Sequence, residues 1–418
     1  MHVWRFDDVP KLPGVGERVS LRDSVTRQPV LAPQAGLARM YACGITPYDA
    51  THLGHAFTYV SIDTLHRAWL DAGLDVHYAQ NVTDVDDPLL ERALDTCVDW
   101  EELAASQVAL YRRDMAALRV LPPTTFRGVV ESLPDVVTFT EKLIAQGSVY
   151  QIEGEFPDWY FAVESAPHFL AGRNLNHELE IFAERGGDPD RKGKRHPLDP
   201  LVWRAQRVGE PSWNLSSMLG MGRPGWHVEC TAIALEALGT HFDVQAGGKD
   251  LAFPHHQMCA IQAECATSEP FAKAYLHVGM VGFQGEKMSK SKGNLVFVSE
   301  LLTRGVPAMA IRLLLLGHHY REDWEYTDQE MANARIRLEQ WQLALLSATS
   351  SAGSSEVIRQ GSEVVAEIRA RLADDLDTPA ALTCIDEWAK NPTDSDSALL
   401  VARVIDFLLG IRLDVSGG

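Results

Sequence analysis

The stretch that decides the fold runs from Leu37 to His55 and reads LARMYACGITPYDATHLGH. Its first seven residues are mostly apolar, as in a buried strand, and the motif HLGH closes the stretch at His52–His55. Gly54 lets the backbone approach a ligand closely, while His52 and His55 can sit together at a helix N-terminus. Because such an N-terminus binds phosphate, the stretch predicts an α/β fold that holds a nucleotide with these two histidines.

A second motif, KMSKS, lies far along the chain at Lys287–Ser291. Its ammonium groups, Lys287 and Lys290, can close over a triphosphate and stabilise the charge that develops there. Taken alone, HLGH also fits ordinary helix-start residues, and KMSKS also fits a solvated basic turn. Together and in this order, they resemble the signature of class I aminoacyl-tRNA synthetases. The resemblance implies that an amino-acid carboxylate attacks the α-phosphate of ATP, which carries Mg²⁺, to give an aminoacyl-adenylate and pyrophosphate.

The order of apolar segments predicts how the chain is organised. Strand-like and helical stretches alternate over residues 38–116, which indicates a parallel, Rossmann-like sheet. We expect a helix over 59–72, a strand over 76–82 and further helices over 298–316 and 327–346. These patterns and the resemblance predict a class I synthetase-like α/β fold with a C-terminal α-helical domain. The first half of the catalytic domain is expected at 1–121, a connective insertion at 122–197 and the second half at 198–296. A helical junction at 297–346 and a linker with the C-terminal helical domain at 347–418 follow.

Composition narrows the class of protein. The chain has 418 residues, of which 46% are hydrophobic, so it can bury substantial cores. No stretch approaches the length of a membrane span and the start has no signal pattern, so we expect a cytoplasmic protein with no membrane partner. A net charge of -19 opposes general binding to polyanions. We interpret the one dense basic run, RKGKR at residues 191–195, as a solvated loop.

Two cysteines and one histidine are candidate metal ligands. Cys43 ends the first strand, where parallel sheets place ligand sites, Cys230 lies in GWHVEC, and His255 opens the pair in FPHH. Each alone also fits a buried thiol or a satisfied histidine. However, the segments that contain them, together with NVTDVDD, GEPSW and KMSKSKGN, resemble the cysteinyl-tRNA synthetases in sequence and in order.

This second resemblance implies one Zn²⁺ per chain, held by Cys43, Cys230 and His255. Zinc prefers a thiolate to a hydroxyl, so contact with the substrate sulfur would separate cysteine from serine. The family usually has a glutamate ligand four residues after the first histidine, whereas this chain has Cys259. Cys259 either approaches the metal as a fourth ligand or is a small core residue that leaves a position open.

Other site residues carry over by motif. Thr46, Thr83 and Trp226 resemble the walls of a cysteine pocket, although each threonine also fits cap or turn chemistry. Asp250 resembles the carboxylate that receives the ribose, and Val281 matches the place where backbone groups meet adenine. The full set expected to bind cysteine and the adenylate is Cys43, Gly44, Thr46, Thr58, Asn81, Thr83, Trp226, Gly248, Lys249, Asp250 and Val281.

The final acceptor of the cysteinyl group is the next question. The segment ERGGDP at Glu184–Pro189, together with HLGH in place of the HIGN usual in cysteinyl-tRNA synthetases, resembles the actinobacterial cysteine:glucosaminyl-inositol ligases of the mycothiol pathway. Only 127 residues follow KMSKS, and residues 347–418 carry six Lys and Arg against twelve Asp and Glu. An acidic C-terminal segment of this kind is poorly suited to bind the anticodon of tRNA. The resemblance therefore implies that L-cysteine, ATP and glucosaminyl-inositol are the substrates and that tRNA is not.

Two alternatives stay open at this point. One is a cysteinyl-tRNA synthetase with a shortened C-terminus. The other is a catalytically silent, synthetase-like binding protein, against which the intact HLGH, KMSKS and candidate zinc residues argue. The residue that takes the proton from an attacking amine is also open between His55 and a neighbouring carboxylate.

Overall fold

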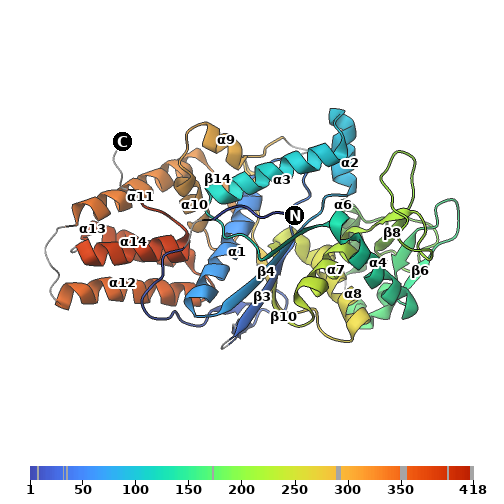
Figure 1. The fold of residues 1–418 in the computed structure, drawn as a ribbon, viewed down its shortest axis with the longest axis horizontal. Helices are drawn as coiled ribbons and strands as arrows, with labels where there is room; N and C mark the ends of the chain where they lie inside the picture. The colour runs from blue at the N-terminus through green and yellow to red at the C-terminus, as the bar shows by residue number, and fades with distance from the viewer. Residues whose placement is uncertain are drawn as a thin grey trace.

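A five-stranded parallel sheet forms the centre of the molecule (Figure 1). The computed structural model describes residues 1–6, 9–31, 33, 36–171, 174–288, 293–348, 355–392 and 395–414. The strand order is β11-β10-β3-β4-β5, and every neighbouring pair is parallel. This order confirms the predicted Rossmann-like sheet. Its strands are β3 (Leu37–Ala42), β4 (Asp75–Val82), β5 (Thr125–Gly128), β10 (Phe242–Gly248) and β11 (Ala272–Val278).

Helices cover both faces of this sheet (Figure 1). On one face, α1 (Leu53–Asp71) packs against β4 and β10 and, on its other side, against α10 (Ala308–Leu316) and α14 (Ser395–Leu409). Because α1 has neighbours on several sides, nearly all its residues are buried, and it begins earlier than the expected helix over 59–72. The opposite face is covered by α7 (Trp226–Leu238), which packs against β3, β4, α4 (Val129–Ala145) and α8 (Gln257–Thr267).

A second, antiparallel sheet interrupts the two halves of the parallel sheet. Its order is β6-β7-β8-β9, and two helices lie in the same part of the chain. β5 lies just inside the segment expected as the insertion, and the domain boundaries drawn from the sequence stay predictions. The elements are β6 (Val149–Gln151), β7 (Trp159–Phe161), α5 (Pro167–Leu170), α6 (Leu175–Glu184), β8 (Leu201–Ala205) and β9 (Gly222–Pro224).

The basic run in this region lies in a loop, as expected, and Lys192 and Arg195 are exposed there, but Lys194 is not solvated. The Lys194 side chain is only 2% exposed, and its ammonium group lies 3.0 Å from Asp188 Oδ1 and 5.0 Å from the centre of the Phe182 ring. Arg191 lies 3.0 Å from Asp158 Oδ2. A carboxylate and aromatic faces replace the water around the Lys194 cation, and a local charge count cannot foresee such partners.

The remaining helices form the C-terminal part of the molecule. The single helix expected over 298–316 is two helices, α9 (Val298–Thr303) and α10, because Gly305 has a φ of +79° and Pro307 precedes α10. A three-stranded sheet of order β13-β12-β14 lies beside them. The elements not yet named are β1 (Ser20–Arg22), β2 (Pro29–Leu31), α2 (Asp87–Thr96), α3 (Trp100–Ala117), β12 (Val281–Phe283), β13 (Glu286–Lys287), β14 (Trp324–Tyr326), α11 (Asp328–Ser347), α12 (Ser355–Ala373) and α13 (Thr378–Lys390).

The C-terminal helices share a core with the catalytic part. Apolar side chains of α1, α10, α13 and α14 belong to one buried cluster. Within it lies a fully buried charge network in which Arg67 Nε lies 2.7 Å from Asp63 Oδ2 and Arg312 also contacts this carboxylate. Arg67 Nη1 donates to the Phe407 carbonyl at 2.8 Å. None of the helices in the described part of the chain is both long and apolar enough to cross a bilayer.

Candidate active site

The first part of the site is a close crossing of backbone at the ends of β3 and β4. The Gly44 N–H donates to Asn81 Oδ1 at 2.8 Å, and Asn81 Nδ2 donates to Thr83 Oγ1 at 3.2 Å. A Cβ at Gly44 would lie 1.6 Å from the Asn81 carbonyl oxygen, so only glycine fits here. The structure therefore brings together three predicted site residues. Thr46 follows directly, and its carbonyl accepts from the Tyr48 N–H at 2.9 Å.

The HLGH motif forms the N-terminus of α1. His52 is the N-cap residue, and its Nδ1 accepts from the Gly54 N–H at 3.0 Å. The rings of His52 and His55 lie 3.9 Å apart between centroids, with an angle of 30°. Burial lowers the pKa of His55 to about 4, so its ring is neutral at pH 7 and can donate a hydrogen bond without carrying charge. Thr58, one turn later, donates through Oγ1 to the Gly54 carbonyl at 3.1 Å.

The chain that leaves KMSKS is attached to the HLGH turn. The Leu53 N–H donates to the Val296 carbonyl and the Val298 N–H donates to the Thr51 carbonyl, both at 2.9 Å. Lys290 lies outside the described residues. The backbone of Lys287 ends β13, but its side chain lies outside the described part of the chain. The flank of one motif therefore meets the other, while the roles of Lys287 and Lys290 stay predictions.

The residues expected to bind the nucleotide lie at the end of β10, in the turn that follows it, and at the start of β12. A Cβ at Gly248 would lie 2.6 Å from Asp250 Oδ1, so glycine allows this carboxylate to fold back over the strand end. Val281 is buried, and its carbonyl accepts from the Met288 N–H at 3.2 Å. Lys249 is exposed, and its ammonium group lies 2.7 Å from Asp323 Oδ2. The Lys249 side chain, which was expected to bind the nucleotide, therefore forms an exposed ion pair with Asp323.

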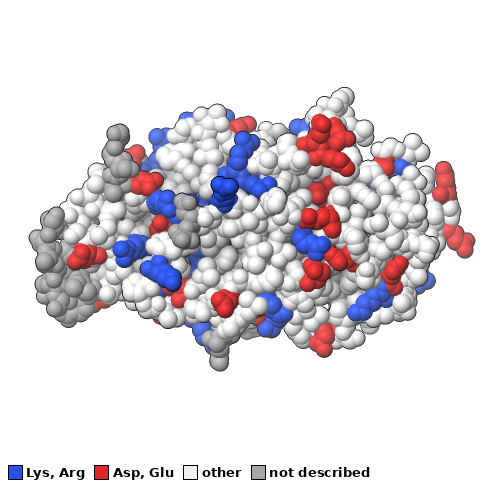
Figure 2. Space-filling view, viewed as in Figure 1, with Lys and Arg blue, Asp and Glu red and all other residues white. Residues whose placement is uncertain are grey.

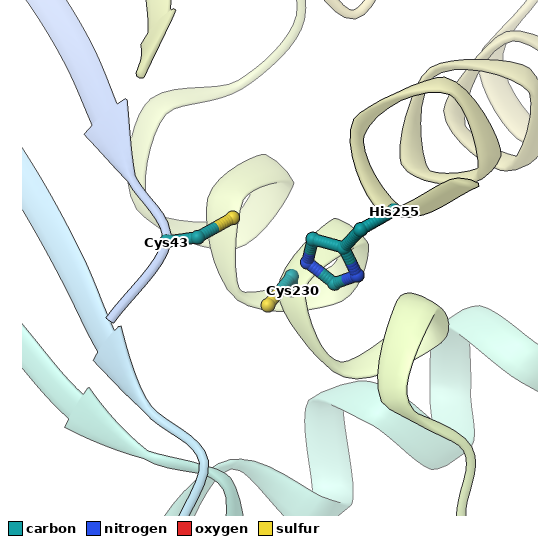
Figure 3. Close-up of side chains that lie close together, drawn as sticks. All are labelled: Cys43, Cys230 and His255. Atoms are coloured by element: carbon teal, nitrogen blue, oxygen red, sulfur yellow. The ribbon is translucent and has the colours of Figure 1, made fainter. Parts of the chain in front are cut away.

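The predicted metal ligands lie together in the interior (Figure 3). Cys43 follows β3, Cys230 belongs to α7, and His255 precedes α8; all three are buried, with their ligand atoms within 4.8 Å of one another. A hydrogen bond from Cys43 lowers the pKa of the Cys230 thiol well below its usual value, whereas burial raises the pKa of Cys43. Two thiols and one imidazole are a donor set typical of zinc, so the residues fit this metal.

A layer of aromatic and imidazole rings surrounds His255. The half-buried Trp226 ring stacks on it at 4.2 Å between centroids, and His227 Nδ1 lies 2.9 Å from His255 Nδ1. Cys259 is fully buried, with its Sγ 3.9 Å from His255 Nε2 and 3.4 Å from the His227 carbonyl oxygen. Cys259 borders the group of Cys43, Cys230 and His255, but its sulfur does not lie within 4.8 Å of all three ligand atoms.

Sequence reasoning missed the partners of Cys43. His256 Nε2 and Gln245 Nε2 each lie 3.3 Å from Cys43 Sγ, and all three side chains are buried. His256 also contacts His277, with 2.8 Å between Nδ1 and Nε2. Such partners orient a ligating sulfur. The second histidine of FPHH was the available signal for His256, whereas Gln245 carries no local signal.

Charge on the molecular surface is mixed. On the face drawn in Figure 2, acidic side chains gather where α2 lies, and basic side chains lie next to them. Among the described side chains on this face, the two signs are interspersed and do not form one continuous basic surface.

Comparisons with known proteins agree with this geometry. The family model for tRNA synthetases class I (C) catalytic domain matches residues 30–336. The L-cysteine:1D-myo-inositol 2-amino-2-deoxy-alpha-D-glucopyranoside ligase of Streptomyces coelicolor is 52% identical, over 99% of this chain and 100% of the relative. The ligase of the same name from Thermobispora bispora is 53% identical, with the same coverage.

Solved structures show the same fold at low sequence identity. Mycobacterium tuberculosis methionyl-tRNA synthetase bound by methionyl-adenylate has a TM-score of 0.64 and 15% identity, and the match covers 89% of this chain and 92% of that one. Agrobacterium radiobacter LeuRS has a TM-score of 0.63 and 12% identity, with coverage of 97% and 85%. With its matching catalytic domain and full-length similarity, the chain belongs to the family of L-cysteine:1D-myo-inositol 2-amino-2-deoxy-alpha-D-glucopyranoside ligases, which have a class I (C) synthetase catalytic domain.

Proposed function

We propose that this chain joins L-cysteine to the amine of glucosaminyl-inositol in mycothiol biosynthesis, using ATP and releasing AMP and pyrophosphate. The observation that carries this proposal is the buried group of Cys43, Cys230 and His255, in which the Cys43 carbonyl accepts a hydrogen bond at 3.1 Å from the Tyr59 hydroxyl of α1, the helix that begins at HLGH. In the proposed function this group selects the thiol and the N-terminus of α1 binds phosphate. The names of relatives about 52% identical over their full length support the same activity.

In the first half-reaction, a cysteine carboxylate oxygen bonds to the α-phosphorus of ATP, and the bond from that phosphorus to the bridging oxygen of pyrophosphate breaks. The N-terminus of α1 and the neutral His55 donate to the phosphates. Lys287 and Lys290 neutralise the charge that grows on the leaving pyrophosphate, together with Mg²⁺. Asp250 accepts from the ribose hydroxyls, and the backbone at Val281 meets adenine.

Cysteine is selected at the group of Cys43, Cys230 and His255, where Cys43 follows β3 and Cys230 belongs to α7. When bound, zinc supplies a soft ligand position that favours a thiolate over a hydroxyl. In this proposal Thr46 and Thr83 contact the substrate beside Cys43, and the Trp226 ring, which stacks on His255, supplies a rigid apolar face. Serine would leave the soft position without its preferred partner, so discrimination needs no separate editing site.

In the second half-reaction, the sugar amine bonds to the carbonyl carbon of cysteinyl-adenylate, and the bond from that carbon to the phosphate oxygen of AMP breaks. Holding both reactants in one pocket replaces an encounter in solution. The amine loses a proton as the amide forms. His55 and Asp250 interact electrostatically with each other, and either can accept that proton.

The test is incubation of the protein with ATP, cysteine and either glucosaminyl-inositol or tRNA, followed by mass detection of the product. We expect the amide of cysteine and the sugar amine, and no product when serine replaces cysteine. Charging of tRNA without sugar acylation would instead support a cysteinyl-tRNA synthetase. Absence of cysteine-dependent ATP–pyrophosphate exchange would support a binding protein without this catalytic activity.

A further inference from the structure

The ERGGDP segment ends helix α6 in a specific way. The Gly187 N–H donates to the Phe182 carbonyl at 2.8 Å, the Gly186 N–H lies 3.3 Å from the Ala183 carbonyl oxygen, and Gly186 has a φ of +83°. These bonds form a Schellman cap, which needs glycine at the left-handed position. A Cβ at Gly187 would lie 2.4 Å from the Phe182 ring, so the second glycine is also required. The cap fixes Arg185 as the C-cap residue, directly after the last helical residue Glu184.

Asp188 of this segment anchors the cap to the insertion. Asp188 accepts a hydrogen bond from the Tyr160 hydroxyl, and its Oδ1 lies 3.0 Å from the buried Lys194 ammonium group. Lys194 also donates to the Pro197 carbonyl at 2.7 Å. A buried charge with several partners holds one geometry, so the end of α6 is a rigid point of the antiparallel region.

Arg185 reaches from that rigid point to the catalytic part of the chain. Its Nη1 donates to the backbone carbonyls of Asp250 and Phe253. The turn that carries them is irregular, because a 3-10 turn (Lys249–Leu251) runs into a π-helical turn (Ala252–His256) with Phe253 at φ -134° and ψ 135°. α6 also packs against this second turn. One guanidinium therefore bonds two carbonyls of a turn without regular helical geometry.

We propose that Arg185 is a positioning residue for cysteine activation, which holds the turn between Asp250 and His255 in its working shape. This inference rests on the proposed function, in which Asp250 binds the ribose and His255 binds zinc. Both groups lie on the turn that Arg185 bridges, Asp250 at one bonded carbonyl and His255 two residues after the other. The insertion thereby supports the nucleotide site and the cysteine site through one side chain. Arg185 itself touches neither substrate.

The variant that isolates this contact is Arg185→Met, which keeps the aliphatic stem but removes the donors. We expect cysteine-dependent ATP–pyrophosphate exchange to fall about tenfold to hundredfold in kcat/KM, because charged hydrogen bonds that hold the site are lost. The KM values for cysteine and for ATP should both rise, since one turn serves both sites. Zinc release to a chromogenic chelator should become faster, which is a readout independent of activity. Arg185→Lys should restore part of each effect, because an ammonium group can donate but lacks the planar fork.

Arg191→Met is the matched control within the same insertion. Arg191 lies 3.0 Å from Asp158 Oδ2 and donates to the Phe156 carbonyl at 3.0 Å, so among the described residues its side chain bonds within the insertion. This variant should keep both KM values and the rate of zinc release. Equal losses in Arg191→Met and Arg185→Met, with equal decreases in Tm, would show that Arg185 acts only through stability of the insertion and would overturn the proposal.

The unaltered protein distinguishes this inference from the proposed function. If it shows no cysteine-dependent exchange, the proposed function is wrong. If it shows exchange and Arg185→Met matches it in kinetics and zinc release, the function stands and the role of Arg185 is wrong. A change confined to the KM for glucosaminyl-inositol would also overturn the inference, because it would place Arg185 at the acceptor.

Discussion

At the residue scale, the site depends on two glycines, which have no side chain, as much as on its polar side chains. Gly44 permits a backbone crossing in which a Cβ would lie 1.6 Å from the Asn81 carbonyl oxygen, and Gly54 leaves room for the His52 ring, 2.8 Å from a Cβ built there. Gly44 thus lets the ends of β3 and β4 approach each other, and Gly54 lets the His52 ring lie against the first turn of α1.

The candidate zinc ligands lead to the first prediction. The purified protein should contain about one zinc per chain, and Cys43→Ala, Cys230→Ala or His255→Ala should lose both the metal and cysteine-dependent exchange. Metal content measured by elemental mass spectrometry checks this expectation. Cys97→Ala is the matched control, because Cys97 is an exposed thiol at the end of α2. Full activity in a protein shown to be free of metal would contradict the zinc site.

A buried histidine outside the site predicts how stability depends on pH. Burial lowers the pKa of His66 to about 4, whereas an unfolded chain has a histidine pKa near 6.5. Between these values the unfolded state binds more protons, so the contribution of His66 is complete above pH 6.5 and is lost as pH falls to about 4. The loss from this one group is at most about 3 kcal/mol.

Urea unfolding at several pH values measures this effect. His66→Phe removes the titrating ring from its contact with Tyr78 while keeping an aromatic side chain. The free energy of unfolding should fall less steeply between pH 6.5 and pH 4 in this variant than in the unaltered protein. Parallel slopes would mean that His66 becomes protonated without unfolding.

At the element scale, backbone hydrogen bonds join the HLGH motif to the chain that follows KMSKS. Residues 296–298 after KMSKS pair with residues 51–53 at the start of α1. The described chain that follows the motif, at residues 296–298, is therefore fixed to the start of α1.

This arrangement predicts a rate effect for the loop lysine. Lys290→Ala should slow adenylate formation by on the order of a hundredfold, about 3 kcal/mol, while cysteine binding changes little, because the charge matters most as pyrophosphate leaves. Rapid-quench measurement of the first turnover checks this. Lys273→Ala, which removes a half-exposed partner of Asp243 elsewhere on the sheet, should leave the rate unchanged. An unchanged rate in Lys290→Ala would mean that KMSKS is only a turn here.

At the scale of the whole molecule, the C-terminal helices and the catalytic part share one buried core. Arg312 is fully buried, contacts Asp63 of α1, and donates to the Leu118 carbonyl at 2.7 Å and to the Leu409 carbonyl at 2.5 Å. One side chain therefore ties α1, the end of α3 and the end of α14. Removing it would leave the Asp63 carboxylate with fewer partners in a buried position.

We accordingly expect Arg312→Met to lower the free energy of unfolding by about 3–5 kcal/mol. Urea denaturation followed by circular dichroism measures the change. Arg304→Met, which removes an exposed ion pair with Glu300, is the control and should cost less than about 1 kcal/mol. A loss in Arg312→Met no larger than in this control would mean that the apolar core alone joins the two parts.

Much of the site was predictable from the sequence because its chemistry is carried by short motifs. HLGH, KMSKS, the metal-ligand candidates and the alternation of strands and helices each depend on neighbouring residues. The parallel sheet confirms what the alternation predicted, and Cys43, Cys230 and His255 lie together as the resemblance to cysteinyl-tRNA synthetases implied. The break between α9 and α10 was also encoded locally, by Gly305 and Pro307, although the apolar run on either side concealed it.

What only the tertiary structure decided are contacts between residues far apart in the chain. A charge run predicted solvent around Lys194, but Asp188 and two aromatic rings enclose it. Gln245 reaches Cys43, and Arg185 bonds to the turn after β10, only because the insertion and both halves of the sheet fold together. Local patterns specify which chemistry a residue can perform, whereas burial and partners depend on the packing of the whole chain.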